Sequence, residues 1–321
     1  MSTIDRVATA QQSAYLLNQI NQDSSTLSKT TDQIASGDVS TTYAGFGNQA
    51  QVLQATISAN ARNAAYTTAT TLATTQADLQ DTQLTGLSSL ATQLQTAVSD
   101  AVANNDPSTL MTQVQSIFDQ ATSILNSQDA NGDYIYGGGN STTPPVSVTS
   151  LSQLTALGSS ASGAFTNGND LKSVQVADGQ TVTYGMTASS IGQGLMQEIQ
   201  NIANFDGGST GDFSGSTSLS QAQNTFLTGE LSSLTTVNTN LNNVTAQNGD
   251  VYNQLQSASS QQSDMNTLYS GFISNIQDTN MADAATQLQL NQTALQAALQ
   301  VTSTLNQLSL LNYMPVATTT G

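Results

Sequence analysis

Apolar residues recur at regular steps along the last third of the chain. From Leu227 to Ile276 every step is four or three residues, and twelve of fifteen positions are apolar. A repeat of this length predicts one long helix packed in a coiled-coil-like bundle. Its polar members, Asn238, Asn248 and Gln262, are of the kind that fixes helix register. The apolar members are Leu227, Leu231, Leu234, Leu241, Val244, Val251, Leu255, Ala258, Met265, Tyr269, Phe272 and Ile276.

Helical spacing also covers the N-terminal part and the C-terminal end. Ile20, Leu27 and Ile34 stand seven residues apart and predict a helix over 8–34, which Gly37 would end. Further helices are expected over 48–102, from about 107 to 127, and in a new phase after 276. The expected buried side of the second helix consists of Leu72, Leu79, Leu87, Leu90, Leu94, Val98 and Ala101.

The middle of the chain has a different pattern. Tyr134-Ile135-Tyr136 is a short β-prone run, and two further β-prone runs flank Asp178-Gly179 and predict a hairpin with a two-residue turn. A short helix is expected over 191–205. The predicted fold is therefore mainly α with a β-containing insert, in which the N- and C-terminal regions form a long antiparallel helical bundle or coiled coil.

This pattern predicts three domains. Residues 1–40 and 285–321 would form an assembly domain of terminal helices. Residues 41–140 and 216–284 would form a helical-bundle domain with a β-hairpin. Residues 141–215 would form an inserted α+β outer domain.

Composition excludes several classes of function. The chain has 4 cationic residues against 21 acidic ones, so it lacks the clustered Lys and Arg that binding to nucleic acid or anionic membranes requires. It has no Cys and no His, which removes thiol and imidazole catalysis and zinc sites built on those residues. No stretch has the apolar length of a membrane-spanning helix, and the first residues lack the pattern of a cleaved signal peptide.

Three motifs suggest chemistry and fail on inspection. Asp129, Asn131 and Asp133 have the spacing of calcium ligands, but Tyr134 stands where the loop needs Gly, so a plain turn is expected. Gly137-Gly138-Gly139 lacks the Lys-Ser/Thr pair of a phosphate loop. The pair Asp278 and Asp283 fits a solvated face or a helix N-terminus. We predict no catalytic, cofactor or metal site.

The two ends of the chain carry apolar stripes that nothing else in the chain is large enough to cover. Such stripes predict packing between subunits. The alternative is that the two ends cover each other in a monomer. The predicted subunit-packing residues are Leu16, Ile20, Leu27, Ile34, Leu288, Leu295, Leu299 and Leu308.

Local motifs resemble those of the bacterial flagellin family, which includes hook-associated protein 3, the hook-filament junction protein. The resemblance spans about 1–140 and 220–314. It rests on the segments Gln33-Ile34-Ala35-Ser36-Gly37, Tyr134-Ile135-Tyr136-Gly137-Gly138, Ile276-Gln277-Asp278-Thr279-Asn280-Met281-Ala282-Asp283-Ala284, Leu295-Gln296-Ala297-Ala298-Leu299 and Leu308-Ser309-Leu310-Leu311-Asn312-Tyr313-Met314. The scarcity of Lys and Arg departs from the family and puts its salt bridges in doubt here.

The resemblance implies a function and a set of partners. Family members are exported unfolded through the flagellar type III apparatus, held beforehand by a chaperone on the C-terminal region, and assemble outside the cell on the flagellum. Their terminal helices become ordered as subunits stack. The implied partners are copies of the chain and other flagellar subunits, namely hook-associated proteins and flagellin. The implied function is that of the junction protein, with the filament flagellin as the alternative.

Two readings from other classes remain open. The acidic, Ser/Thr-rich insert suits a binding or adhesin module, which would require residues 141–215 to fold and bind alone. A hydrolase with a carboxylate site is the other. Only two of the acids are Glu, Glu198 and Glu230, and nothing in the sequence groups them.

Overall fold

The computed structural model describes the backbone of residues 3–313 and the side chains of residues 11–305 and of Gln307. The chain divides into two compact units. One consists of residues 1–62 and 265–321, and the other of residues 63–264. The predicted class is confirmed, because long helices dominate and the described residues hold one two-stranded sheet.

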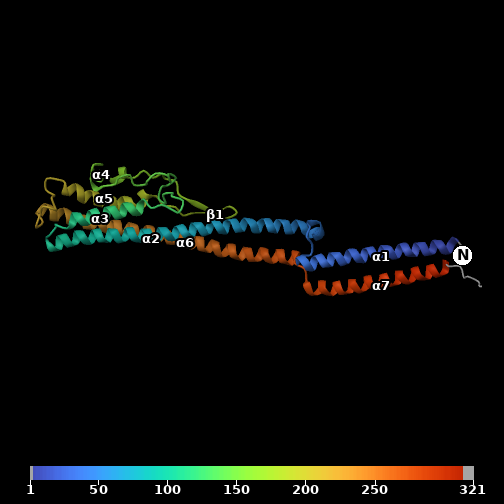
Figure 1. Cartoon of the computed structure of the whole chain (residues 1–321). Helices are drawn as coiled ribbons and strands as arrows, with labels where there is room; N and C mark the ends of the chain where they lie inside the picture. Colours follow the sequence, from blue (N-terminus) through green and yellow to red (C-terminus); the bar gives the residue numbers. More distant parts are fainter. Residues whose placement is uncertain (1–2, 314–321) are drawn as a thin grey trace, which may run out of the picture. The chain divides into compact units, whose positions relative to one another are not determined.

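The unit formed by the two chain ends contains a pair of long helices. Helix α1 (Thr3–Ser36) lies beside α7 (Met281–Tyr313), as Figure 1 shows. Gly37, with φ 80°, ends α1 and donates its N–H to the carbonyl of Gln33 at 2.9 Å. An antiparallel bridge between Asp38 and Asp278 ties the start of the following loop to the residues before α7. A 3₁₀-helix, η1 (Tyr43–Gln49), leads into α2.

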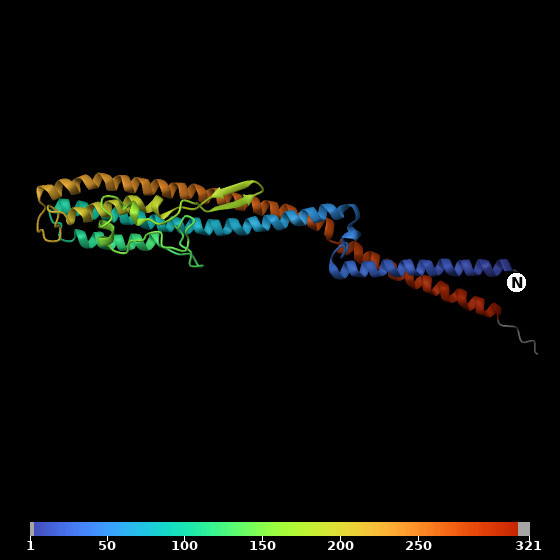
Figure 2. The same ribbon diagram turned by 90° about the horizontal axis from the view of Figure 1, so that it is seen from above.

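Residues 63–264 are organised around α2 (Ala50–Asn104) and α6 (Gln221–Gln277), which run side by side in this unit (Figure 2). Helices α3 (Leu110–Leu125) and α5 (Ala188–Asp206) pack on them and on each other. A single large core joins the four helices, as expected when each presents an apolar stripe. Its largest fully buried side chains include Phe118, Tyr136, Leu87, Leu94 and Leu195.

The segment between α3 and α5 adds short elements to this unit. Strands β1 (Ser173–Ala177) and β2 (Gln180–Thr183) form the expected antiparallel hairpin, and Gly179 has the positive φ of 74° that its turn requires. The short helices α4 (Leu151–Thr155) and η2 (Ala161–Ala164) were not foreseen. Leu154, Ala161 and Ala164 belong to the same core as the four helices. The segment therefore packs on the bundle and shares its core. The outer domain at 141–215 stays a prediction.

Several side-chain expectations were wrong. Leu72 is 69% exposed and Leu79 is 40% exposed, because Ala73 and Ala77 form the buried side of that part of α2. These small residues let the hairpin and Leu255 of α6 approach closely. In the apolar repeat, Phe272 is 50% exposed. Residues 134–136 form no strand; Tyr134 makes only an isolated bridge with Gln128.

The polar members of the repeat bond α6 to α2, as a register function requires. The Asn248 side-chain amide donates to the carbonyl of Ala77 at 2.8 Å. Gln262 donates to the Thr70 hydroxyl at 2.9 Å and to the carbonyl of Val176 in β1 at 2.8 Å. Asn238 donates to the side chain of Gln95 at 3.0 Å. Each amide can make these bonds only at one relative height of the two helices.

Gly168 is expected to be among the least replaceable residues of the middle segment. A Cβ at this position would overlap the carbonyl oxygen of Gly138, so the backbones would have to separate. Their close approach also lets the Gly168 N–H donate to the carbonyl of Gly137 at 2.8 Å. Gly168→Ala should lower the free energy of unfolding by about 1–3 kcal/mol, measured by urea denaturation.

Gly249→Ala provides the matched control for this prediction. Gly249 lies inside α6, and a Cβ added there would meet nothing within 4 Å, so Ala should raise stability by about 0.5–1 kcal/mol through helix propensity. Equal effects of the two substitutions would contradict the close-approach explanation.

Candidate assembly surface

The α1–α7 pair brings most of the predicted packing residues together. Leu16, Ile20, Leu27 and Ile34 of α1 and Leu288 and Leu295 of α7 are all half-buried. On the same faces of the two helices, Thr30 and Ala284 are buried, with 5% and 6% of their surface exposed. We call these eight residues the seam.

One hydrogen bond marks the register of the seam. The side-chain amide of Asn291 donates to the Thr30 hydroxyl at 3.3 Å. In an antiparallel pair, this contact places Ile34 at the level of Leu288 and Leu27 at the level of Leu295. The predicted packing residues of α1 and those of α7 therefore contact each other within one chain. This is the arrangement that the alternative prediction, in which the two ends cover each other in a monomer, requires for these residues.

Large apolar side chains also lie outside the seam. Tyr15 is 69% exposed and Leu17 is 56% exposed on α1; on α7, Leu290 is 58%, Leu299 is 51% and Val301 is 48% exposed. At about 100° per residue, Tyr15 and Leu17 fall on opposite sides of the α1 seam. By the same geometry Leu290 and Val301 flank one side of the α7 seam and Leu299 flanks the other. We call these five residues the flank residues.

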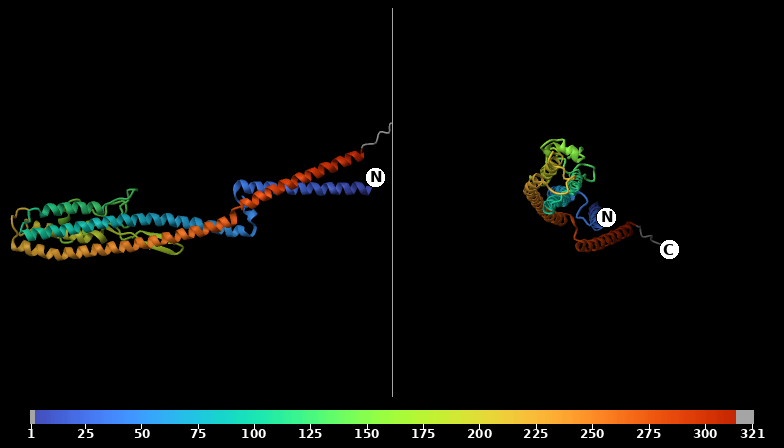
Figure 3. Two further views of the ribbon diagram at one scale, coloured as in Figure 1. Left: turned by 90° about the horizontal axis from the view of Figure 1, so that it is seen from below. Right: turned by 90° about the vertical axis from the view of Figure 1, so that its left-hand side faces the viewer.

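Because of the flank residues, the apolar side of each helix is wider than the stripe that the other helix of the α1–α7 pair covers. On α7 the arc from Leu290 to Leu299 takes in about half of the circumference. A single neighbouring helix covers a narrower stripe. The remaining apolar surface on both sides of the pair is a candidate surface for further helices. Figure 3 shows the ribbons of these two helices, α1 in blue and α7 in red.

The outcome for the predicted packing residues is therefore mixed. Six of them lie in the seam, Leu299 is a flank residue, and Leu308 lies outside the residues whose side chains are described. Tyr15, Leu17, Leu290 and Val301 were not among the predicted set. A helical projection of each end, rather than a search for steps of three and four, would have shown them beside the stripe.

The motifs that suggested ion binding have structural explanations. The Asp129 carboxylate accepts the backbone N–H groups of Asn131 at 2.8 Å and of Asp133 at 3.1 Å, which makes the expected turn. Asp283 lies in the first turn of α7, where its carboxylate accepts a bond from the Asn280 side chain at 2.8 Å. The part of the chain that is described contains no group of three or more residues suited to hold a metal ion.

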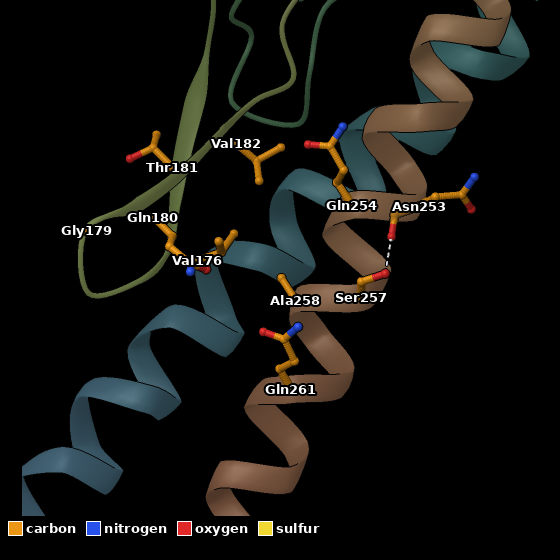
Figure 4. A pocket seen from close by; sticks show the side chains of 10 residues that line it. All are labelled: Val176, Gly179, Gln180, Thr181, Val182, Asn253, Gln254, Ser257, Ala258 and Gln261. Carbon is orange, nitrogen blue, oxygen red and sulfur yellow. Dashed lines mark hydrogen bonds between the residues drawn. The ribbon is translucent and has the colours of Figure 1, made fainter.

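A shallow groove between the hairpin and α6 is lined by uncharged residues alone. It encloses about 600 Å³ in residues 63–264, and its wall is formed by β1, β2 and α6 (Figure 4). None of its lining residues is charged. They are Val176, Gly179, Gln180, Thr181, Val182, Asn253, Gln254, Ser257, Ala258 and Gln261.

Residues 231–314 match the family model of the bacterial flagellin C-terminal helical region. The predicted resemblance to the flagellin family is confirmed. The matched residues of this flagellin-like chain include most of α6 and all the α7 residues of the seam and flanks. A sequence comparison with curated proteins finds no match.

Two solved structures share the fold. A putative flagellar hook-associated protein from Vibrio parahaemolyticus is 18% identical, with a TM-score of 0.56, over 71% of this chain and 97% of that one. FlgL from Bacillus cereus is 13% identical, with a TM-score of 0.51, over 69% of this chain and 98% of that one. Within the described residues, no helix is both long and apolar enough to cross a membrane.

Proposed function

We propose that this flagellin-like chain is a structural subunit of the bacterial flagellum, the hook-filament junction protein, and that it self-assembles through α1 and α7. The observation that carries the proposal is the set of flank residues on both sides of the seam. They leave apolar surface that one chain does not cover, on the two helices that the chain ends supply.

The energetics favour coverage by neighbouring subunits. Full burial of an exposed Leu or Val side chain contributes about 1.5–3 kcal/mol. The flank residues are 48–69% exposed, so covering all five contributes a part of this amount at each position in every subunit. Part of it offsets the entropy lost when subunits dock and side chains order. Helices of neighbouring subunits that nest against both sides of the pair would bury these residues in every copy.

The comparisons support a place at the junction. The two solved structures are a putative hook-associated protein and FlgL, and nearly the whole length of each is matched by this chain. The partners we propose are copies of the chain, hook-associated proteins and flagellin, with an export chaperone on the C-terminal region. We place the protein outside the cell on the flagellum, after type III export, and assign it no enzymatic activity.

The filament flagellin is the second candidate. The family model that matches residues 231–314 is that of the bacterial flagellin C-terminal helical region, so the filament flagellin stays the alternative. The two candidates differ in the extent of self-assembly, because a junction protein forms a short collar whereas filament flagellin forms the bulk of a long polymer.

Electron microscopy of the concentrated, purified chain tests the proposal and separates the two candidates. We expect the protein to remain monomeric when dilute and to form short rings or collars when concentrated. Long filaments from this chain alone would favour the flagellin alternative. A monomer that persists at high concentration, and also fails to add to purified hook or filament ends, would overturn both candidates.

A further inference from the structure

The fold brings the side chains of the only two glutamates of the chain within hydrogen-bond reach of each other. Glu198 lies on α5 and Glu230 on α6, although nothing in the sequence groups them. Glu198 is 8% exposed. Glu230 is half-buried, and its Oε2 atom is buried without a hydrogen-bond partner. The neighbouring turns of the two helices supply core residues, among them Leu195 and Ile202 on α5 and Leu227 and Leu234 on α6.

The pair has too few donors to hold two negative charges. The side-chain amide of Asn201 donates to Oε2 of Glu198 at a long distance of 3.5 Å. Two ionised carboxylates are acceptors only and repel each other, so such a pair retains a proton that one carboxyl donates to the other. Burial, and then the hydrogen bond and charge of Glu230, raise the pKa of Glu198 to about 8.

Among the described residues, Glu230 is the charged group that shifts the pKa of Glu198. Of the elements packed against α5, α4 and η2 carry no titratable residue, and α3 carries only Asp119, which is exposed and accepts a bond from Gln115. On α6, Glu230 is the group that acts on Glu198. The charge state of this contact is therefore decided between the two glutamates.

Helix α5 also anchors the short elements of the middle segment. The Gln197 side chain accepts the N–H of Ala161 at 2.9 Å and donates to the carbonyl of Ser159 at 3.1 Å. Gln200 donates to the carbonyl of Leu154 at 2.7 Å. A change in the contact between α5 and α6 would consequently be passed to residues 154–161.

We propose that Glu198 and Glu230 form a proton-operated latch that fastens α5, together with residues 154–161, to α6. With one proton shared, the two carboxyls attract and close the contact. When the proton is lost, two buried negative charges face each other and the contact loosens. The latch goes beyond the assembly function and is independent of it.

The direction of the pH effect follows from the raised pKa. In the unfolded chain the carboxyl releases its proton near the ordinary value of 4.5, and in the folded chain near 8. The stabilisation is complete below the first value and is lost as pH rises toward the second. Within this window the contribution to the unfolding equilibrium changes by about tenfold per pH unit.

Urea denaturation of the full chain between pH 5 and 9 tests the latch, with Glu198→Gln as the main variant. The amide donates to Glu230 at every pH, so the variant should fold and lose the tenfold-per-unit decline in stability. Asp250→Asn removes an exposed acid of α6 and should keep the decline of the parent chain. An unchanged decline in Glu198→Gln would overturn the proposal.

Two spectroscopic measurements do not depend on the folding of that variant. Infrared spectra of the parent chain at pH 6.5 should show one protonated carboxyl that disappears above pH 8. In Glu230→Gln, whose amide can donate to ionised Glu198, this signal should already be absent at pH 6.5. Hydrogen exchange, corrected for intrinsic rates, should rise in α5 and residues 154–161 between pH 6.5 and 9. Absence of the protonated carboxyl, or calcium binding in place of the proton, would refute the latch.

Discussion

Leu299→Asp is expected to abolish assembly of the concentrated chain while leaving the thermal unfolding of the monomer unchanged. Leu299 is 51% exposed in the single chain, so the new carboxylate stays hydrated there. In an assembly that covers the flank residues, the same carboxylate loses water without gaining a partner, which costs several kcal/mol in every subunit. Since about 1.4 kcal/mol is a factor of ten in affinity, assembly should fall by at least about a hundredfold.

Gln300→Asp is the matched control for this substitution. It adds the same charge to the next residue of α7, on a side that points away from both seam and flanks by about 100° per residue. It should assemble like the parent chain in light scattering and electron microscopy. If both variants fail to assemble, added charge rather than the position of Leu299 is responsible. If both assemble normally, the flank residues are not the assembly surface.

The choice of Leu299 over Leu295 depends on the structure. The two positions look equivalent in the sequence, since both belong to the same apolar phase after residue 276. Leu295 is half-buried against α1, so an aspartate there would also separate the two helices of a single chain. A loss of assembly in Leu295→Asp would therefore not distinguish a subunit contact from a broken monomer.

The long helices were predictable because their pattern repeats many times. The apolar repeat from Leu227 to Ile276 predicts a helix that the structure places at Gln221–Gln277. The extent of helix α2 was predicted nearly as well. The side of it that is buried was predicted wrongly near Leu72 and Leu79, which are exposed. Small buried residues such as Ala73 carry little hydrophobic signal, although they decide where another element can approach.

Short elements and long-range contacts were beyond the sequence pattern. Helix α4 has five residues, which is too few for a helical period to be seen. Leu154 packs in the core of the bundle against residues that are distant in the sequence. The pattern of residues around Leu154 does not predict such a contact. The pairing of Glu198 with Glu230 is of the same kind, because it depends on which faces of α5 and α6 meet.

The candidate assembly surface was half predictable. The seam follows from steps of three and four residues, which find the centre of an apolar stripe. Whether a seam residue faces the same chain or another subunit cannot be decided from spacing, and the structure places six of the predicted residues between α1 and α7. A helical projection places the flank residues beside the stripe, but their exposure, such as 69% for Tyr15, is what shows that the other helix of the pair leaves them uncovered.

Assembly is also expected to depend steeply on ionic strength, and to slow by at least about tenfold between 0.15 M and 0.01 M sodium chloride. Residues 63–264 contain fifteen acidic residues and one cationic residue, Lys172. Subunits that stack bring these negative units near one another. The Debye length grows from about 8 Å to about 30 Å over this range, so repulsion between neighbours that is screened at the higher concentration acts fully at the lower one.

The dependence of the assembly rate on salt should arise from repulsion between acidic residues and not from a change in the strength of the apolar contact. Low concentrations of sodium chloride act mainly by screening, whereas strengthening of apolar burial requires excluded solutes such as sulfate or sucrose. Replacement of exposed acids in the triple variant Asp78→Asn, Asp81→Asn and Asp250→Asn should reduce the slope of the assembly rate against salt, measured by light scattering. Leu299→Asp should fail to assemble even at 0.15 M, because screening does not remove the cost of dehydrating a carboxylate. A rate that is the same at both salt concentrations would mean that neighbouring acidic units stay far apart in the assembly.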